Sequence, residues 1–178
     1  MSGSDLSVSR RAILAGGVAA GVSLAVAPSL LAQDAAKSGA LLTRTIPSSG
    51  EKIPIVRVGT NNYSPKDETE TAARRDVLRR MAEAGAKVID TAPLYGRSEV
   101  VLGQLMAGLN NRDKFFVATK TLPNVGPEQA QAVFEKSLAD LKVKSVELIQ
   151  IHNLAHVDAL MPVLAEWKKA GKAKYIGV

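Results

Sequence analysis

The stretch KVIDTAPLYGRSEVVLGQLMAGL, residues 87–109, combines the two hydrophobic periods on which the fold prediction depends. Residues 87–90 form a short apolar run that ends in a carboxylate, which is typical of a buried strand. Ser98 is a favourable N-cap residue, and the apolar residues of 99–109 fall on one face of a helix. A strand followed directly by an amphipathic helix predicts one β/α unit.

The same unit recurs on both sides of this stretch. A hairpin is predicted at residues 43–46 and 52–55, with turn residues between its strands. Further strands are predicted at residues 56–60, 87–90, 115–119, 146–151 and 175–178. Helices are predicted at residues 69–84, 99–109, 127–141 and 157–170. Four residues at or next to the ends of the first four strands mark a regular repeat, with intervals of 31, 30 and 32 residues: Gly59, Asp90, Lys120 and His152.

Alternating strands and helices predict a parallel sheet covered by helices. No G-x-G-x-x-G segment follows a predicted strand, so a dinucleotide-binding doubly wound sheet is not favoured. The predicted fold class is α/β, of the (β/α)8 TIM-barrel type. Because such a barrel needs about 250 residues, these 178 residues are expected to hold only about its first five strands and four helices.

Composition excludes several kinds of protein. The chain has no cysteine and only two histidines, so disulfides, thiolate chemistry and a multi-histidine metal site are not expected. Aromatic residues make up 4% of the chain, too few for a stacking platform for single-stranded nucleic acid. The net charge of +6 comes from dispersed basic residues rather than from one stripe. We therefore expect no metal and no nucleic-acid partner.

The N-terminus has the pattern of an export signal. Ser9 is followed by the pair Arg10-Arg11, and residues 12–33 carry no charge. Adjacent arginines before an apolar run resemble the twin-arginine signal, which the twin-arginine export machinery reads. The expected organisation is a signal peptide at 1–33, a linker at 34–42 and the incomplete barrel at 43–178. The expected location is periplasmic or exported, with a membrane anchor as the alternative if the signal is not cleaved.

Three successive predicted strands each end in an ionisable residue, namely Asp90, Lys120 and His152, and Tyr95 follows Asp90 by five residues. For any one of them, simple solvent exposure is an alternative explanation. In a β/α barrel, however, the carboxyl ends of the strands converge on the active site. A phenol beside an ammonium, a carboxylate and an imidazole suits protonation of a carbonyl oxygen. The hydride for such a reduction must come from a cofactor.

The motif Asp-Thr-Ala-Pro-Leu-Tyr-Gly-Arg-Ser-Glu at 90–99 closely resembles the signature of the aldo/keto reductase family. The segments FVATK at 116–120, LIQIH at 148–152 and YIGV at 175–178 match later family segments in the same order. The resemblance implies a barrel that reduces aldehydes or ketones with NADPH, with NADH as the alternative. It implies that Tyr95 is the proton donor, that Lys120 and Asp90 tune it, and that His152 orients the carbonyl.

The resemblance also indicates weaker candidates. Gly59, Thr60 and Asp90 are candidate cofactor contacts, although a turn role is equally expected for the first two. Asn153 is a candidate substrate contact, with loop capping as its alternative. The family places most of its cofactor contacts beyond the segment that Val178 closes.

Three hypotheses therefore stay open: a reductase completed by a C-terminal half, a non-catalytic barrel remnant or binding module, and a barrel enzyme of different chemistry. An open parallel sheet also predicts self-association, because its edges and its inner face lack cover.

Overall fold

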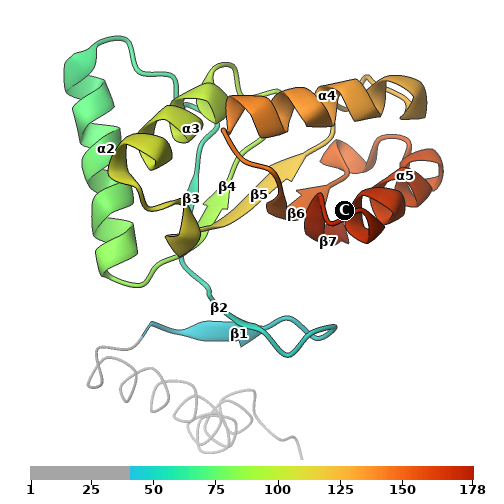
Figure 1. Ribbon diagram of the computed structural model, residues 1–178, viewed down its shortest axis with the longest axis horizontal. Coiled ribbons are helices and arrows are strands. Elements are labelled where there is room, and N and C mark those ends of the chain that lie inside the picture. The colour runs from blue at the N-terminus through green and yellow to red at the C-terminus, as the bar shows by residue number, and fades with distance from the viewer. Residues whose placement is uncertain (1–40) are drawn as a thin grey trace, which may run out of the picture. The chain divides into compact units, whose positions relative to one another are not determined.

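The computed structural model describes residues 41–178, and the contacts within the chain group residues 43–178 into one unit (Figure 1). The predicted signal peptide and nearly all of the predicted linker lie outside the described residues. Within the described part of the chain, no helix combines the length and the apolar character needed to cross a membrane.

The unit begins with a two-stranded hairpin. Strand β1, Thr43–Thr45, pairs antiparallel with β2, Lys52–Pro54, as the sequence predicts. The turn closes because the N–H groups of Ser49 and Gly50 both donate to the carbonyl oxygen of Ile46. Gly50 has a φ of +73°, which glycine adopts without the steric cost that a side chain would add.

The main sheet has five parallel strands in the order β3-β4-β5-β6-β7. Their bounds are β3 Arg57–Gly59, β4 Val88–Asp90, β5 Phe116–Lys120, β6 Val146–Gln150 and β7 Ala173–Gly177. The helices between them are α2 Glu68–Glu83, α3 Ser98–Leu109, α4 Pro127–Asp140 and α5 Val157–Lys169, with 3-10 turns at Arg112–Lys114 and His152–Leu154. Sequential parallel strands linked by helices form the first part of a (β/α) barrel, so the predicted fold class is confirmed.

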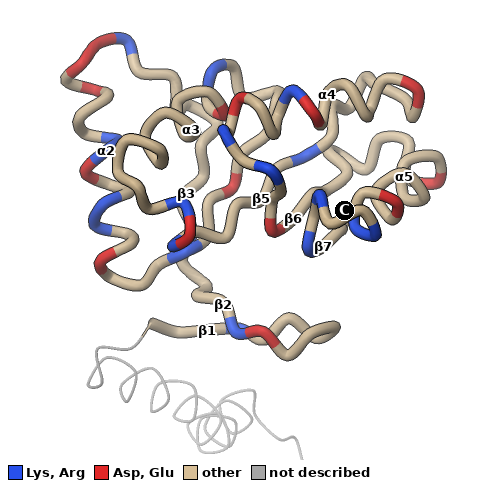
Figure 2. The backbone as a smooth tube through the Cα atoms, in the orientation of Figure 1, with Lys and Arg blue, Asp and Glu red and all other residues tan. Residues whose placement is uncertain are grey.

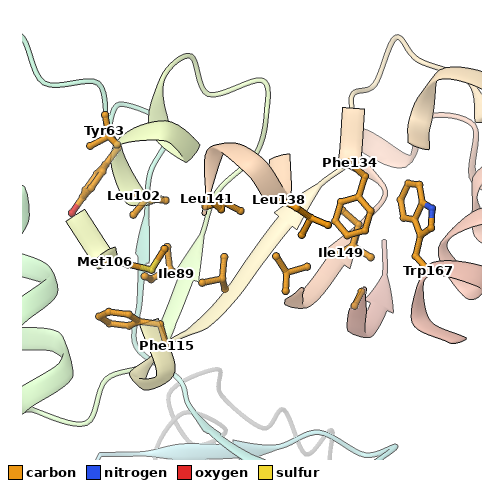
Figure 3. Packing of buried hydrophobic residues seen from close by; sticks show 14 of the residues in the cluster. Tyr63, Ile89, Leu102, Met106, Phe115, Phe134, Leu138, Leu141, Ile149 and Trp167 are labelled. Atoms are coloured by element: carbon orange, nitrogen blue, oxygen red, sulfur yellow. The ribbon is translucent and has the colours of Figure 1, made fainter. Parts of the chain in front are cut away.

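Helices and sheet share one apolar core. Ile89, Val117 and Ile149 point from three neighbouring strands into this core and are fully buried. Figure 3 shows Ile89 and Ile149 among side chains of α3 and α4, with the Phe134 ring next to the Trp167 indole. The two ring centroids are 4.4 Å apart. Burying one such side chain contributes about 1.5–3 kcal/mol. The core therefore holds rigid the strands that carry the site.

Helix α2 departs from its predicted packing. In the sequence, Ala73, Val77 and Leu78 fall on one stripe of this helix, which predicts that all three are buried. Ala73 and Val77 are nevertheless exposed, Val77 by 43%, and Leu78 is the one fully buried residue of this helix. The reason is that α2 follows β3, the edge strand of the described sheet, and packs against α3. Figure 2 shows acidic and basic residues mixed along α2, where Arg79 forms ion pairs with Asp76 and Glu83.

The expected exposure of the inner sheet face is wrong at one end. The hairpin turn reaches β7: the Tyr175 hydroxyl contacts Ser49 at 2.8 Å and Glu51 at 2.5 Å. Tyr175 also stacks on Phe116, and both rings are buried. The remaining part of this face is a hollow of about 360 Å³ with residues of the hairpin and of β4–β6 on its walls. The hairpin therefore covers this part of the inner face.

Candidate functional site

The parallel sheet brings Asp90 and Lys120 to its carboxyl edge on neighbouring strands. Asp90 ends β4 and pairs in register with Ala118, two residues before Lys120 at the end of β5. Lys120 Nζ donates to Asp90 Oδ1 over 2.6 Å and to the carbonyl oxygen of Thr91 over 2.9 Å. The two charged side chains are only 13% and 18% exposed. The lysine ammonium is therefore held in one place by a mostly buried ion pair.

Tyr95 lies between a cation and an imidazole. It follows β4 in the loop that leads into α3, and its N–H donates to the carbonyl oxygen of Ala92. Lys120 Nζ lies 4.9 Å from the centroid of the Tyr95 ring. The His152 ring meets the same phenol edge-on, with 5.8 Å between centroids and 86° between planes. The four residues singled out from the sequence thus form one cluster.

His152 is the most buried member of this cluster. It lies two residues after the end of β6, and its backbone N–H donates to the Thr121 hydroxyl over 3.2 Å. Its side chain is 8% exposed, and its Nδ1 is buried without a hydrogen-bond partner among residues 41–178. Burial, and then the nearby Lys120 ammonium, lower the pKa of His152 below its ordinary value of 6.5. The imidazole is therefore neutral at neutral pH.

Gly59 and Thr60 lie next to the cluster. Gly59 pairs in register with Asp90, and open space surrounds the position of an added Cβ. The N–H and the hydroxyl of Thr60 both donate to the Asp90 carbonyl oxygen over 3.0 Å. The Thr60 side chain thus performs the turn role that the sequence left open, and its contact with a cofactor stays a prediction.

Asn153 does not join the cluster. It is exposed and adopts a left-handed φ of 55° within the turn that follows β6. Among the described residues its side chain has no hydrogen-bond partner. The backbone of Asn153 thus takes a left-handed turn position, no capping bond of its side chain is seen among the described residues, and the substrate contact stays a prediction.

Two contacts of the site escaped sequence reasoning. Arg57 Nη1 lies 3.9 Å from Asp90 Oδ2, but the arginine is 66% exposed. The prediction that Ser98 is the N-cap of α3 is wrong. The helix begins at Ser98, and the N-cap residue is Arg97, whose side chain makes no capping bond. The Ser98 hydroxyl is instead turned toward the carbonyl oxygens of Thr60 and Tyr95. Its position three residues after Tyr95 was the only signal in the sequence.

The parallel sheet and the cluster at its carboxyl edge define a protein of the (β/α)-barrel class. Its particular family follows from comparison with known proteins. Residues 56–178 match the aldo/keto reductase family, and the chain belongs to this family.

Three relatives illustrate the relationship. The chain is 34% identical over 113 residues to the methylglyoxal reductase YeaE of Escherichia coli, a match that covers 61% of this chain and 39% of that protein. It is 33% identical over 135 residues to an aldo-keto reductase of Mycolicibacterium smegmatis, covering 71% and 44%. A Klebsiella pneumoniae aldo-keto reductase solved in complex with NADPH shares 26% identity and a TM-score of 0.61, covering 78% of this chain and 50% of that one. The chain thus spans about two fifths of the length of these curated relatives.

The described residues fit one end of a nicotinamide cofactor. At the strand ends, open space surrounds the Cβ position of Gly59, and the buried Nδ1 of His152 has no hydrogen-bond partner among the described residues. Between residues 41 and 178, no glycine-rich loop follows a strand to hold the phosphates. The fit therefore covers the reactive end of the cofactor and not its phosphate groups.

Proposed function

We propose that this chain takes part in the NADPH-dependent reduction of an aldehyde or ketone to an alcohol, with Tyr95 as the proton donor and NADH as the alternative cofactor. Membership of the aldo/keto reductase family supports the reaction class. The single observation that carries the assignment of Tyr95 is its place between the Lys120 ammonium, 4.9 Å from the ring centroid, and the His152 imidazole.

Each residue of the cluster has a role in this proposal. A reduced nicotinamide, when bound, supplies the hydride that reaches the carbonyl carbon. Tyr95 donates its phenolic proton to the carbonyl oxygen, and the Lys120 ammonium stabilises the negative charge left on the phenolate. Asp90 keeps that ammonium in place through the 2.6 Å ion pair. The neutral His152 imidazole donates a ring N–H to the substrate oxygen, on which negative charge develops.

The cofactor contacts form a second part of the proposal. Asp90, Gly59 and Thr60 would contact the reactive end of the cofactor at the strand ends. The phosphates need other donors, since no glycine-rich loop among the described residues offers them. We propose that a complementing C-terminal half supplies these donors. Asn153, on the turn after β6, would contact the substrate.

Substitution of single tyrosines tests the proton donor. With NADPH and 4-nitrobenzaldehyde, Tyr95→Phe should lower kcat by about 10²–10⁴-fold, the usual contribution of general acid catalysis. Binding of NADPH, followed by fluorescence titration, should not change. The matched control is Tyr175→Phe, which removes a phenol that contacts Ser49 and Glu51 at the hairpin. Equal turnover by Tyr95→Phe and the parent chain would remove Tyr95 from this role.

The same assay separates the main alternative. Assays of the full chain should be run alone and with a C-terminal half taken from a relative. NADPH oxidation that depends on Tyr95 in either mixture supports the reductase. A folded chain that neither binds NADPH nor reduces the aldehyde in either mixture favours the non-catalytic remnant or binding module.

Export through the twin-arginine machinery is a separate proposal that rests on Arg10-Arg11 and the uncharged residues 12–33. Replacing both arginines by lysine should keep the chain out of the periplasmic fraction and at its unprocessed mass of 18.8 kDa. Arg44→Lys, which lies beyond the linker, is the control and should not alter the fractionation. Periplasmic recovery of the double lysine variant would contradict the proposal.

A further inference from the structure

The hydroxyl of Ser98 joins two loops at the carboxyl edge of the sheet. Ser98 is fully buried at the first position of α3. Its Oγ lies 2.6 Å from the carbonyl oxygen of Thr60 and 2.7 Å from that of Tyr95. Because a serine hydroxyl has one proton, the two carbonyl oxygens share it. One side chain thus links the residue after β3 to the tyrosine of the site.

Thr60 extends this link to the ion pair. Its N–H and its hydroxyl both donate to the Asp90 carbonyl oxygen over 3.0 Å. The carboxylate of the same Asp90 binds Lys120 Nζ. A continuous set of hydrogen bonds therefore runs from Tyr95 through Ser98 and Thr60 to the residue that holds the ammonium.

A second bond ties the same two loops together at their exposed side. The N–H of Arg97 donates to the Ser64 hydroxyl over 3.1 Å. Between Tyr95 and Arg97, Gly96 has a φ of +60°, in the left-handed region that favours glycine. Hydrogen bonds of Ser98 and Arg97 thus tie the turn that presents Tyr95 to the β3–α2 loop.

We propose that Ser98 is a positioning residue for Tyr95, holding the phenol against Lys120 and His152 by bonding the Tyr95 carbonyl to that of Thr60. That the placement of the Tyr95 phenol matters for catalysis rests on the proposed function. That Ser98 sets this placement does not. Loss of the hydroxyl removes the side-chain link between the two loops, and each carbonyl oxygen then keeps only a donor from its own loop, the Ser98 N–H for Tyr95 and the Tyr63 N–H for Thr60. The Tyr95 turn then relaxes outward, and the phenol ring no longer covers the His152 imidazole.

The imidazole of His152 reports this movement without any need for turnover. In the full chain labelled at histidine and tyrosine, NMR should show a nuclear Overhauser effect between the Tyr95 and His152 rings. It should also show a His152 titration midpoint below 6.5, because the ring is buried. In Ser98→Ala the ring–ring effect should be lost and the midpoint should rise toward 6.5. A His156→Gln variant assigns the two imidazole signals.

Ser137→Ala is the matched control. Ser137, on α4, is as buried as Ser98, and its hydroxyl donates over 2.9 Å to the Glu99 side chain of α3 rather than to a carbonyl oxygen of either loop. It should leave the Tyr95–His152 effect and the midpoint unchanged. Should Ser98→Ala not fold, Ser98→Cys preserves the shape with a weaker donor and should move both signals in the same direction by less.

Either of two results overturns the proposal. One is an intact ring–ring effect and an unchanged midpoint in the folded Ser98 variant. The other is an equal change in Ser137→Ala, which would mean that any lost buried hydroxyl loosens the site. A failure of Tyr95→Phe to lower turnover would instead reject the proposed function and leave these NMR results as they stand, so the two failures are distinguishable.

Discussion

The ion pair between Asp90 and Lys120 should be a coupled unit, and a double-mutant cycle can measure the coupling. Asp90→Ala removes the carboxylate, and Lys120→Met removes the ammonium while retaining most of the apolar stem. The pair is joined over 2.6 Å and more than four fifths of each side chain is buried. Solvent therefore screens this interaction far less than it screens a surface pair.

The magnitude follows from what each partner keeps. After Asp90→Ala, Lys120 Nζ still donates to the Thr91 carbonyl oxygen over 2.9 Å. After Lys120→Met, the one charged partner left to Asp90 among residues 41–178 is Arg57 at 3.9 Å, an exposed partner whose contribution is below about 1 kcal/mol. Breaking a fully buried pair costs about 3–5 kcal/mol, and the remaining partners and solvent reduce this. We expect each single substitution to lower the free energy of unfolding by about 2–3 kcal/mol.

The double variant decides whether the reasoning holds. In urea unfolding of the full chain at neutral pH, the double variant should lose about 1.5–2 kcal/mol less free energy of unfolding than the two single variants lose together. The exposed pair of Lys136 and Asp140, one helical turn apart on α4, is the control, with an expected coupling below about 0.5 kcal/mol. Losses in the Asp90 and Lys120 variants that add to within about 0.5 kcal/mol would refute the coupling.

Three further predictions concern the pH dependence of stability and helix packing. Burial raises the pKa of Glu99, so its contribution to stability is full below about pH 4.5 and is lost as the pH rises through the raised value. Glu99→Gln should flatten this part of the pH profile of the free energy of unfolding in urea. An unchanged slope would contradict the assignment. Burial lowers the pKa of His152, so its contribution is present above about pH 6.5 and is lost as the pH falls through the lowered value; His152→Gln should unfold with less pH dependence below 6.5 than the parent chain does. A Cβ at Gly103 would lie 2.2 Å from the Asp140 carbonyl oxygen, so Gly103→Ala should lower the free energy of unfolding by about 3 kcal/mol or more. Gly108 lies on the same helix with open space around its Cβ position, so Gly108→Ala should raise the free energy of unfolding by up to about 1 kcal/mol. Similar unfolding midpoints for the two variants would rule out close packing of α3 on α4.

Much of the fold could be predicted because the relevant signals are local. Alternating strand and helix periods located every β/α unit to within a few residues, and Pro127 marked the start of α4. The convergence of Asp90, Lys120 and His152 also followed from the sequence. Parallel strands in sequential order must bring their carboxyl ends to one edge, whatever the details of packing.

The sequence by itself therefore determined the β/α order, the edge on which the site lies and three of its charged or polar residues. The tertiary structure alone decided which surfaces the elements meet. Val77 follows a helical stripe yet stays exposed, on a helix that packs against α3 at the edge of the described sheet. Tyr175 is covered by a hairpin more than 120 residues away along the chain.

The same reason explains why Ser98 was misassigned. A serine before an apolar helix satisfies the local rule for an N-cap, but its hydroxyl bonds a carbonyl 38 residues away. A local sequence pattern predicts hydrogen bonds only to backbone groups that lie nearby along the chain. Only the folded sheet, by bringing the β3–α2 and β4–α3 loops together, determines which of all the carbonyl oxygens that hydroxyl reaches.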